Sequence, residues 1–145
     1  MWQTVWNWPW VTIWAAISAI FTAGTACVAG WALFRWRKQD ELKAKMAFKQ
    51  AIADYLYALL LLPVDLSEQK VRVEYYDLIM NLISKFNQCR NTLLYCEGLL
   101  DKEINVLAHW HIIYNKHSFF VKGKEDSSDL HNACDSILKI NFIFK

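Results

Sequence analysis

The residue types in this chain that suit metal binding or nucleophilic catalysis are its histidines and cysteines. On a helix, the rings of His109 and His111 would point about 200° apart, so the two cannot face one ion. No Cys-x-x-Cys pair occurs, and His131 with Cys134 at spacing i, i+3 supplies only half of a tetrahedral zinc site. We therefore expect no metal ion and no cofactor, with these side chains packed or facing solvent. The residues concerned are Cys89, Cys96, His109, His111, His117, His131 and Cys134.

A catalytic centre would need a further arrangement of side chains. A cysteine nucleophile requires a base and an orienting group, and nothing in the sequence distinguishes one cysteine as activated. Adjacent acids such as Asp40-Glu41 and Glu125-Asp126 stand in charged or loop-like surroundings, where carboxylates are usually solvated or cap helices. The four glycines are too widely spaced for a phosphate-binding loop. The sequence therefore indicates that the chain is not an enzyme.

Length and charge restrict the remaining possibilities. The chain has 145 residues, which is enough for one membrane span and one small domain. Its net charge is only +2, and the basic residues after Lys49 are interspersed with acidic ones instead of forming a stripe. We therefore expect no direct contact with nucleic acid.

The N-terminal segment is the most distinctive part of the sequence. The first 34 residues contain no Asp, Glu, Lys or Arg, yet they hold six of the eight tryptophans. Residues 9–34 are long enough to cross a hydrocarbon core, which needs about 20 mostly apolar residues. A cleaved signal peptide would carry its positive charge before a shorter apolar run, which is the reverse of this pattern. The sequence predicts a transmembrane segment over residues 1–36 and a cytosolic helical domain over residues 37–145.

The flanking residues predict the topology of this span. Basic residues follow it and none precede it, so the positive-inside rule places the N-terminus outside and the domain in the cytosol, at the bacterial inner membrane. Indole rings prefer the headgroup level, and Trp2, Trp6 and Trp8 extend the outer aromatic belt. The residues predicted to anchor the span at the two interfaces are Trp10, Trp14, Trp31, Arg35, Trp36, Arg37 and Lys38.

The interior of the span is rich in small side chains. Small residues spaced by four let two helix backbones approach closely, which favours self-association within the membrane. The alternative is that any alanine-rich span contains such pairs by chance. The residues predicted to pack against another helix are Ala15, Ala19, Ala23, Ala26 and Gly30.

The rest of the chain shows helical periodicity. Residues 39–62 contain hardly a helix breaker, so the span should continue into a cytosolic helix that Pro63 ends. Apolar residues from Tyr75 to Cys96 alternate in steps of four and three, which is typical of a packing seam. We favour packing within the chain over a dimeric coiled coil, because neighbouring apolar residues widen the stripe.

Two shorter helices and an apolar tail complete the predicted fold. A helix is expected from Asp101 to about Asn115, followed by a loop over residues 122–129. Asp129 is expected to cap a last helix. Residues 140–145 are apolar for a terminus, so they should dock on the bundle itself, on a partner or on a membrane surface. The predicted fold class is all-α, with one N-terminal transmembrane helix that continues into a small helical bundle.

A tryptophan-rich span, the junction Phe34-Arg35-Trp36-Arg37-Lys38 and a small helical domain together resemble small bacterial single-pass membrane proteins. Some of these accompany phage-defence operons of the retron type. The resemblance covers mainly residues 1–62 and is one of architecture. It implies that a partner holds the domain and that release or clustering of the spans injures the inner membrane.

These features lead to two hypotheses for function. The first is a membrane-perturbing effector or toxin of a bacterial antiviral defence system, whose span forms homo-oligomers in the lipid bilayer. The alternative is a non-toxic membrane anchor or accessory subunit that recruits a cytosolic protein partner. A small membrane-bound enzyme is a third possibility, for which the sequence offers no catalytic arrangement.

Overall fold

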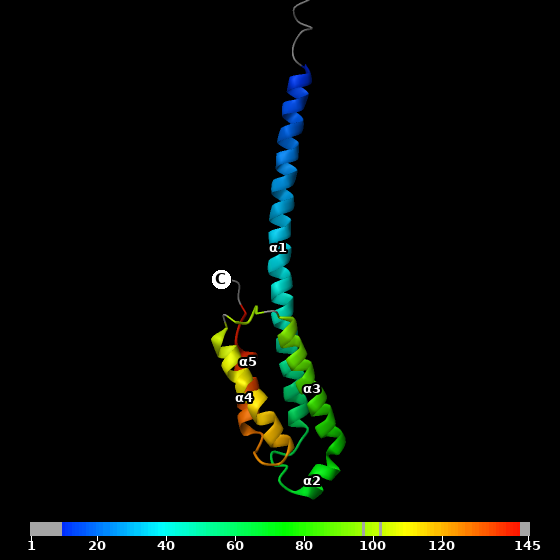
Figure 1. Cartoon of the computed structure of the whole chain (residues 1–145), viewed down its shortest axis with the longest axis vertical. Coiled ribbons are helices and arrows are strands. Elements are labelled where there is room, and N and C mark those ends of the chain that lie inside the picture. Colours follow the sequence, from blue (N-terminus) through cyan, green and yellow to red (C-terminus); the bar gives the residue numbers. More distant parts are fainter. Residues whose placement is uncertain (1–9, 97, 102, 143–145) are drawn as a thin grey trace, which may run out of the picture. The chain divides into compact units, whose positions relative to one another are not determined.

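The computed structural model describes residues 10–96, 98–101 and 103–142, and every regular element in this part of the chain is an α-helix. Predictions that concern Trp2, Trp6, Trp8, Pro9 and the last three residues of the tail lie outside the described residues. The helices, labelled in Figure 1, are α1 (Trp10–Leu60), α2 (Gln69–Glu74), α3 (Tyr76–Tyr95), α4 (Ile104–Val121) and α5 (Ser128–Lys139).

Helix α1 is a single helix of 51 residues. No proline interrupts it, and its last turn closes with a hydrogen bond from the Leu62 amide to the Leu59 carbonyl just before Pro63. The predicted continuation of the apolar segment into a further helix is therefore confirmed. The chain divides into two compact units, an N-terminal unit of residues 1–40 and a C-terminal unit of residues 41–145.

The C-terminal unit is a helical bundle (Figure 1). The part of α1 that follows Asp40 packs with α3, α4 and α5, while the short α2 connects α1 to α3. The buried apolar side chains recur every three or four residues on these helices, which puts the buried ones on one face of each. The largest fully buried side chains are Phe48, Ile52, Tyr55, Leu59, Leu66, Leu82, Leu100, Val106, Ile113, Phe120, Leu130 and Ile137.

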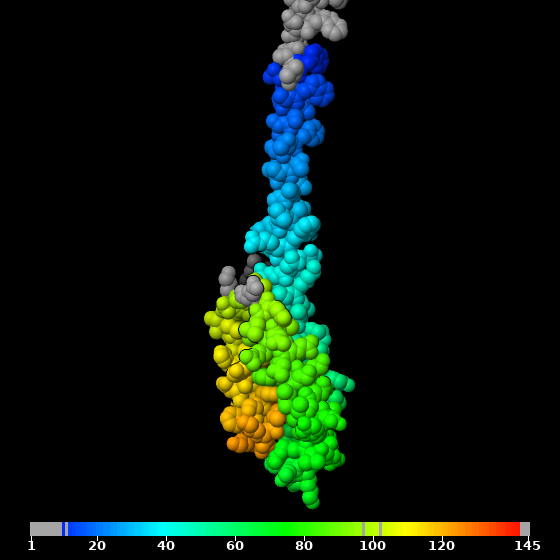
Figure 2. Space-filling model, turned by 45° about the vertical axis from the view of Figure 1, so that its right-hand side comes forward, coloured from blue at the N-terminus to red at the C-terminus, as the bar shows by residue number. Residues whose placement is uncertain are grey.

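The predicted seam of α3 packs inside this unit, as we favoured. Ile79, Leu82 and Cys89 are buried in the core. The Cys89 thiol donates to the Ala51 carbonyl oxygen of α1, with 3.1 Å between sulfur and oxygen. Figure 2 shows the side chains of α3 and α4 meeting on one face of the unit.

Two details of the C-terminal half differ from the prediction. Helix α4 begins at Ile104, because hydrogen bonds from the Asp101 amide to the Gly98 carbonyl and from the Glu103 amide to the Leu100 carbonyl close tight turns before it. It continues to Val121 instead of ending near Asn115. Its apolar residues beyond Asn115 remain in contact with the core, which extends the helix by almost two turns. Asp129 does not cap α5; it lies in the first turn and pairs with Lys116 of α4.

The described part of the apolar tail is docked, as predicted. Ile140 and Phe142 pack against the core of the bundle. The Lys49 ammonium group donates to the Ile140 carbonyl oxygen at 2.8 Å, and it lies 5.8 Å from the centroid of the Phe142 ring. A buried apolar surface and a charge-assisted hydrogen bond therefore hold this end of the chain.

The conformation of Gly123 predicts that the turn after α4 contributes measurably to the stability of the chain. It follows α4 with φ +67, and a Cβ placed there would overlap the Leu66 carbonyl group and the Arg72 guanidinium group. Gly123→Ala should therefore lower the free energy of unfolding of the full chain in detergent by about 2 kcal/mol or more, from backbone strain and a clash with backbone.

Gly98→Ala is the matched control for this substitution. Gly98 has φ +78, but the nearest atoms to an added Cβ belong to the flexible Asp101 side chain. We expect a loss of about 1 kcal/mol, from backbone strain alone. Equal losses for the two variants, measured by chemical unfolding, would show that the contact between Gly123 and Leu66 does not matter.

Candidate functional site

The apolar surface of the N-terminal unit is the first candidate site. Helix α1 is long and apolar enough to cross a membrane, and none of its most apolar 18-residue window is buried by protein. In a soluble domain, an apolar helix of this kind would be covered by other elements. Among the residues that the structure describes, none provides protein cover for this surface.

The five residues predicted for helix packing lie together on this helix. At about 100° per residue, their Cα positions fall within an arc of roughly 80°. All five are exposed, and a Cβ added at Gly30 would meet no atom within 4 Å. The structure thus presents Ala15, Ala19, Ala23, Ala26 and Gly30 as one continuous, uncovered face of small side chains.

Two hydroxyl groups within the apolar segment form hydrogen bonds with the helix itself. Thr22 donates to the Ser18 carbonyl oxygen and Thr25 to the Phe21 carbonyl oxygen, each at 2.8 Å. Polar groups without partners are costly in hydrocarbon, and these bonds remove that cost for the two threonines. The sequence signal for this property is a threonine within a predicted helix, whose hydroxyl can share the backbone carbonyl four residues earlier.

The predicted interfacial anchors form aromatic–cation pairs at spacing i, i+4. The Arg35 guanidinium carbon lies 5.3 Å from the Trp31 ring, and the Lys38 ammonium nitrogen lies 4.9 Å from the Phe34 ring. Trp10, Trp14 and Trp36 are more than half exposed. Exposed indoles next to fixed positive charges suit the headgroup layer of a bilayer, where both groups find partners.

A buried polar contact lies at the centre of the C-terminal unit. The Tyr55 hydroxyl and His117 Nδ1 are 3.0 Å apart, in a core position separated by 62 residues of sequence. The His117 ring stacks on Phe86, with 4.1 Å between centroids and 5° between planes. Burial lowers the pKa of His117 to about 4, so the imidazole is neutral at pH 7 and its Nδ1 can accept the Tyr55 proton.

The sequence analysis did not single out His117 from the other histidines. A signal for its burial is present, since Val106, Trp110, Ile113, His117 and Phe120 alternate steps of four and three and are all buried. Apolar residues on the other faces of α4, such as Ile112 and Phe119, obscure this pattern. His131 Nδ1 donates a hydrogen bond to the Ser127 carbonyl oxygen, at 2.9 Å.

The three cysteines of the C-terminal unit are buried thiols, as expected. Burial raises the pKa of Cys89 to about 12 and raises the pKa values of Cys96 and Cys134. A buried thiol that stays protonated at neutral pH is a poor nucleophile, because the thiolate is the reactive form. Within the described residues, no group of three or more His, Cys, Asp or Glu side chains is placed to hold a metal ion.

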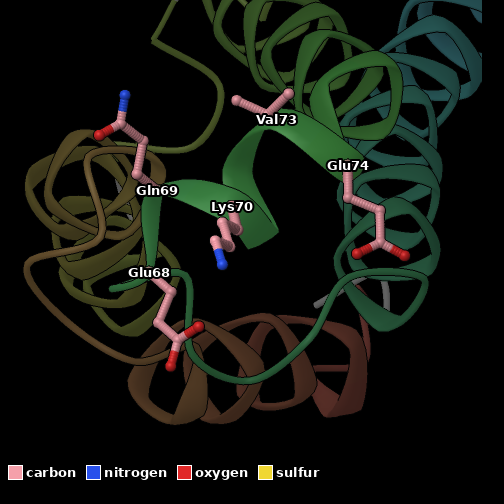
Figure 3. A pocket seen from close by; sticks show the side chains of 5 residues that line it. All are labelled: Glu68, Gln69, Lys70, Val73 and Glu74. Atoms are coloured by element: carbon pink, nitrogen blue, oxygen red, sulfur yellow. The ribbon is translucent and has the colours of Figure 1, made fainter.

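A surface hollow surrounds α2 at the end of the bundle where α1 finishes. Figure 3 shows its lining, in which Lys70 lies among the side chains of Glu68, Gln69, Val73 and Glu74. All five residues are exposed and lie on one short helix and its first flanking residue. An open hollow of flexible, hydrated side chains lacks the apolar enclosure that small-molecule sites usually have.

Comparison with protein-family models, with curated proteins and with solved structures finds no match to this chain. Functional inference therefore depends on the residues and geometry described above.

The depressed pKa of His117 predicts a pH-dependent stability. The unfolded chain binds a proton at the ordinary histidine pKa of 6.5, whereas folded His117 resists protonation down to about pH 4. The contribution of neutral His117 to the free energy of unfolding is complete above pH 6.5. It is lost as the pH falls toward 4, by up to about 3 kcal/mol.

His117→Gln is the matched variant for this test, because glutamine does not titrate. Chemical unfolding of both full chains in detergent, at several values between pH 4 and pH 7, should show a steeper loss for the native sequence. Carboxylates contribute equally to both chains, so only the difference between the two curves reports on His117. Parallel curves would contradict the assignment of a neutral, buried imidazole.

Proposed function

We propose that this chain is a single-pass membrane protein that acts by association rather than by catalysis. In this proposal α1 crosses the bacterial inner membrane with its N-terminus outside, and the C-terminal unit lies in the cytosol. The observation that carries the proposal is the uncovered apolar part of α1, which is followed by Arg35, Arg37 and Lys38, whereas residues 1–34 contain no basic residue.

We propose further that the span itself is the working part and that the protein is a membrane-perturbing effector of a bacterial defence system. The face of small side chains from Ala15 to Gly30 supports this, because it suits close packing of copies of the helix within the bilayer. The cytosolic bundle would then control clustering of the spans. Its compact core and protonated thiols fit a control element better than a reaction site.

A specific observation also favours the alternative, a non-toxic anchor for a cytosolic partner. Helix α4 is apolar on its outer face as well as its inner one, with Ala108, Ile112 and Phe119 exposed one to two turns apart. A helix with two apolar faces usually has protein on both sides. In this version, the outer face of α4 binds the partner and the span only holds the complex at the membrane.

Controlled expression of the full chain in a bacterium tests these proposals. If the span is an effector, growth should stop and the inner membrane should depolarise, as read by a potential-sensitive dye. The control is full-length Ala23→Arg, in which a charge at the centre of the span opposes insertion. Healthy, polarised cells at high expression would contradict the effector proposal.

The anchor alternative predicts a different result in the same cells. One stable partner should co-purify with the chain, and Ile112→Ser with Phe119→Ser should release it without changing membrane insertion. Retention of the partner by this double variant would exclude the outer face of α4 as its binding surface.

A further inference from the structure

One end of the C-terminal unit gathers segments from all four of its long helices. The Cys96 thiol, after α3, donates to the Ala44 carbonyl oxygen at 3.5 Å, and Lys45 pairs with Glu103 before α4 at 3.8 Å. Lys45 also lies 5.9 Å from the ring of Phe142, which follows α5. We call this the Glu41 end, because Glu41 is the first residue of the unit.

The Glu41 end exposes large apolar side chains at the end of α3 and the start of α4. Tyr95 is 80% exposed and Ile104 is 74% exposed, the two highest values among the large hydrophobic residues that the structure describes. Leu94 beside them is 68% exposed. Figure 2 shows this segment, between α3 and α4, at the upper end of the C-terminal unit. Exposure of large apolar side chains to this degree, where α3 connects to α4, is unfavourable in water.

The covalent chain brings the Glu41 end close to the proposed membrane boundary. If Trp36 marks the inner edge of the hydrocarbon, Glu41 follows five residues later, at a helical rise of about 7.5 Å. The headgroup layer on each side of a bilayer is roughly 5–7 Å thick. The exposed residues lie slightly further along, because Cys96, which follows Tyr95, contacts Ala44, at a helical rise of about 12 Å after Trp36. At the usual helix tilt of about 20°, side chains at this level on one side of the unit come within reach of the headgroups.

The charges of this region fit an anionic surface. Arg35, Arg37 and Lys38 are exposed immediately before the unit. Two acidic residues of the Glu41 end are partly neutralised, because Lys45 pairs with Glu41 at 3.2 Å as well as with Glu103. Basic side chains next to a membrane are attracted to anionic lipid headgroups, and a tyrosine ring is favourable at the same depth.

We infer that the Glu41 end of the bundle is a lipid-binding surface, which inserts Leu94, Tyr95 and Ile104 into the anionic headgroup layer of the bilayer that α1 crosses. The inference depends on the proposed membrane insertion. It adds that the bundle is held against the membrane instead of hanging from a single helix. Contacts of this kind restrict how the cytosolic unit can turn and which of its faces a partner can reach.

The test uses the full chain with Cys27→Ala in nanodiscs, since the remaining native thiols are buried. A nitroxide is attached at Tyr95→Cys or Ile104→Cys. The matched control is Val73→Cys on α2, because Val73 is equally exposed at 71% but lies at the opposite end of the unit (Figure 1). In discs that contain anionic lipid, collisions with a water-soluble nickel chelate should be several-fold rarer at positions 95 and 104 than at position 73.

Two results would overturn the inference. One is equal accessibility of the three positions in anionic discs. The other is that positions 95 and 104 remain protected from the nickel chelate in lipid-free detergent while the mass of the protein shows more than one copy. A second copy of the chain, and not lipid, would then cover these positions. A chain that fails to enter the discs contradicts the proposed function as well, whereas a chain that enters with position 95 accessible contradicts only this inference.

Discussion

Replacing Ala19 and Ala23 together by leucine is expected to abolish both the oligomers of the full chain and its arrest of growth. The two alanines lie on the uncovered face of small residues, where close approach of helix backbones is possible. Leucine keeps the span apolar but separates the helices. A loss of roughly 1.4 kcal/mol per contact would weaken association about tenfold. The mass of the detergent-solubilised chain and the growth of expressing cells measure the two effects.

The control places the same bulk on the other side of the span. Thr25 and Ala32 lie more than 100° away from Ala19 around α1, so Thr25→Leu with Ala32→Leu should leave oligomers and growth arrest unchanged. The hydroxyl of Thr25 bonds within its own helix, so its removal leaves no partner in another element unsatisfied. Growth arrest that persists after the oligomers of the Ala19 and Ala23 variant are lost would disprove the proposed mechanism.

Tyr55→Ala is expected to have the largest effect on the stability of the bundle. Tyr55 is fully buried, contacts the rings of Phe86 and His117, and its hydroxyl is 3.0 Å from His117 Nδ1. Removal of a buried aromatic ring should cost about 4 kcal/mol, from lost transfer energy and the cavity that remains. This loss corresponds to about a thousandfold increase in the population of open molecules.

Alkylation of Cys89 and Cys134 in the full chain, with Cys27→Ala, measures this opening, because both thiols are inaccessible in the folded state. Tyr57→Ala is the matched control, since Tyr57 lies two residues away on α1 and is 66% exposed. Its effect should stay within about 0.5 kcal/mol. Equal alkylation rates for the two alanine variants would contradict the packing described here.

Tyr55→Phe separates the hydrogen bond from the ring. It should cost about 1–2 kcal/mol, because it keeps the ring but leaves the His117 nitrogen without its partner in the core. An effect as small as that of Tyr57→Ala would show that the hydroxyl is not needed in the core.

Local patterns predicted much of this fold. The step of four and three along α3 identified its buried face, and Pro63 identified the end of α1, because both signals act over a few neighbouring residues. The same reasoning placed the end of α4 too early. Helix α4 is apolar on most sides, so no change of periodicity marks the point where its contact with the core should stop.

The sequence by itself determined the helical class, the apolar segment with its basic boundary, and the small residues that share a face of α1. These properties depend on composition and on spacing within one helix, so no distant contact is required to read them. Only the tertiary structure decided that His117 is the buried histidine and that Tyr55 is its partner. It likewise decided that Gly123 lies against Leu66 and that Tyr95 and Ile104 are exposed. The reason is physical: burial, pKa and exposure depend on residues brought together from distant parts of the chain, and spacing along the sequence does not specify which helices meet.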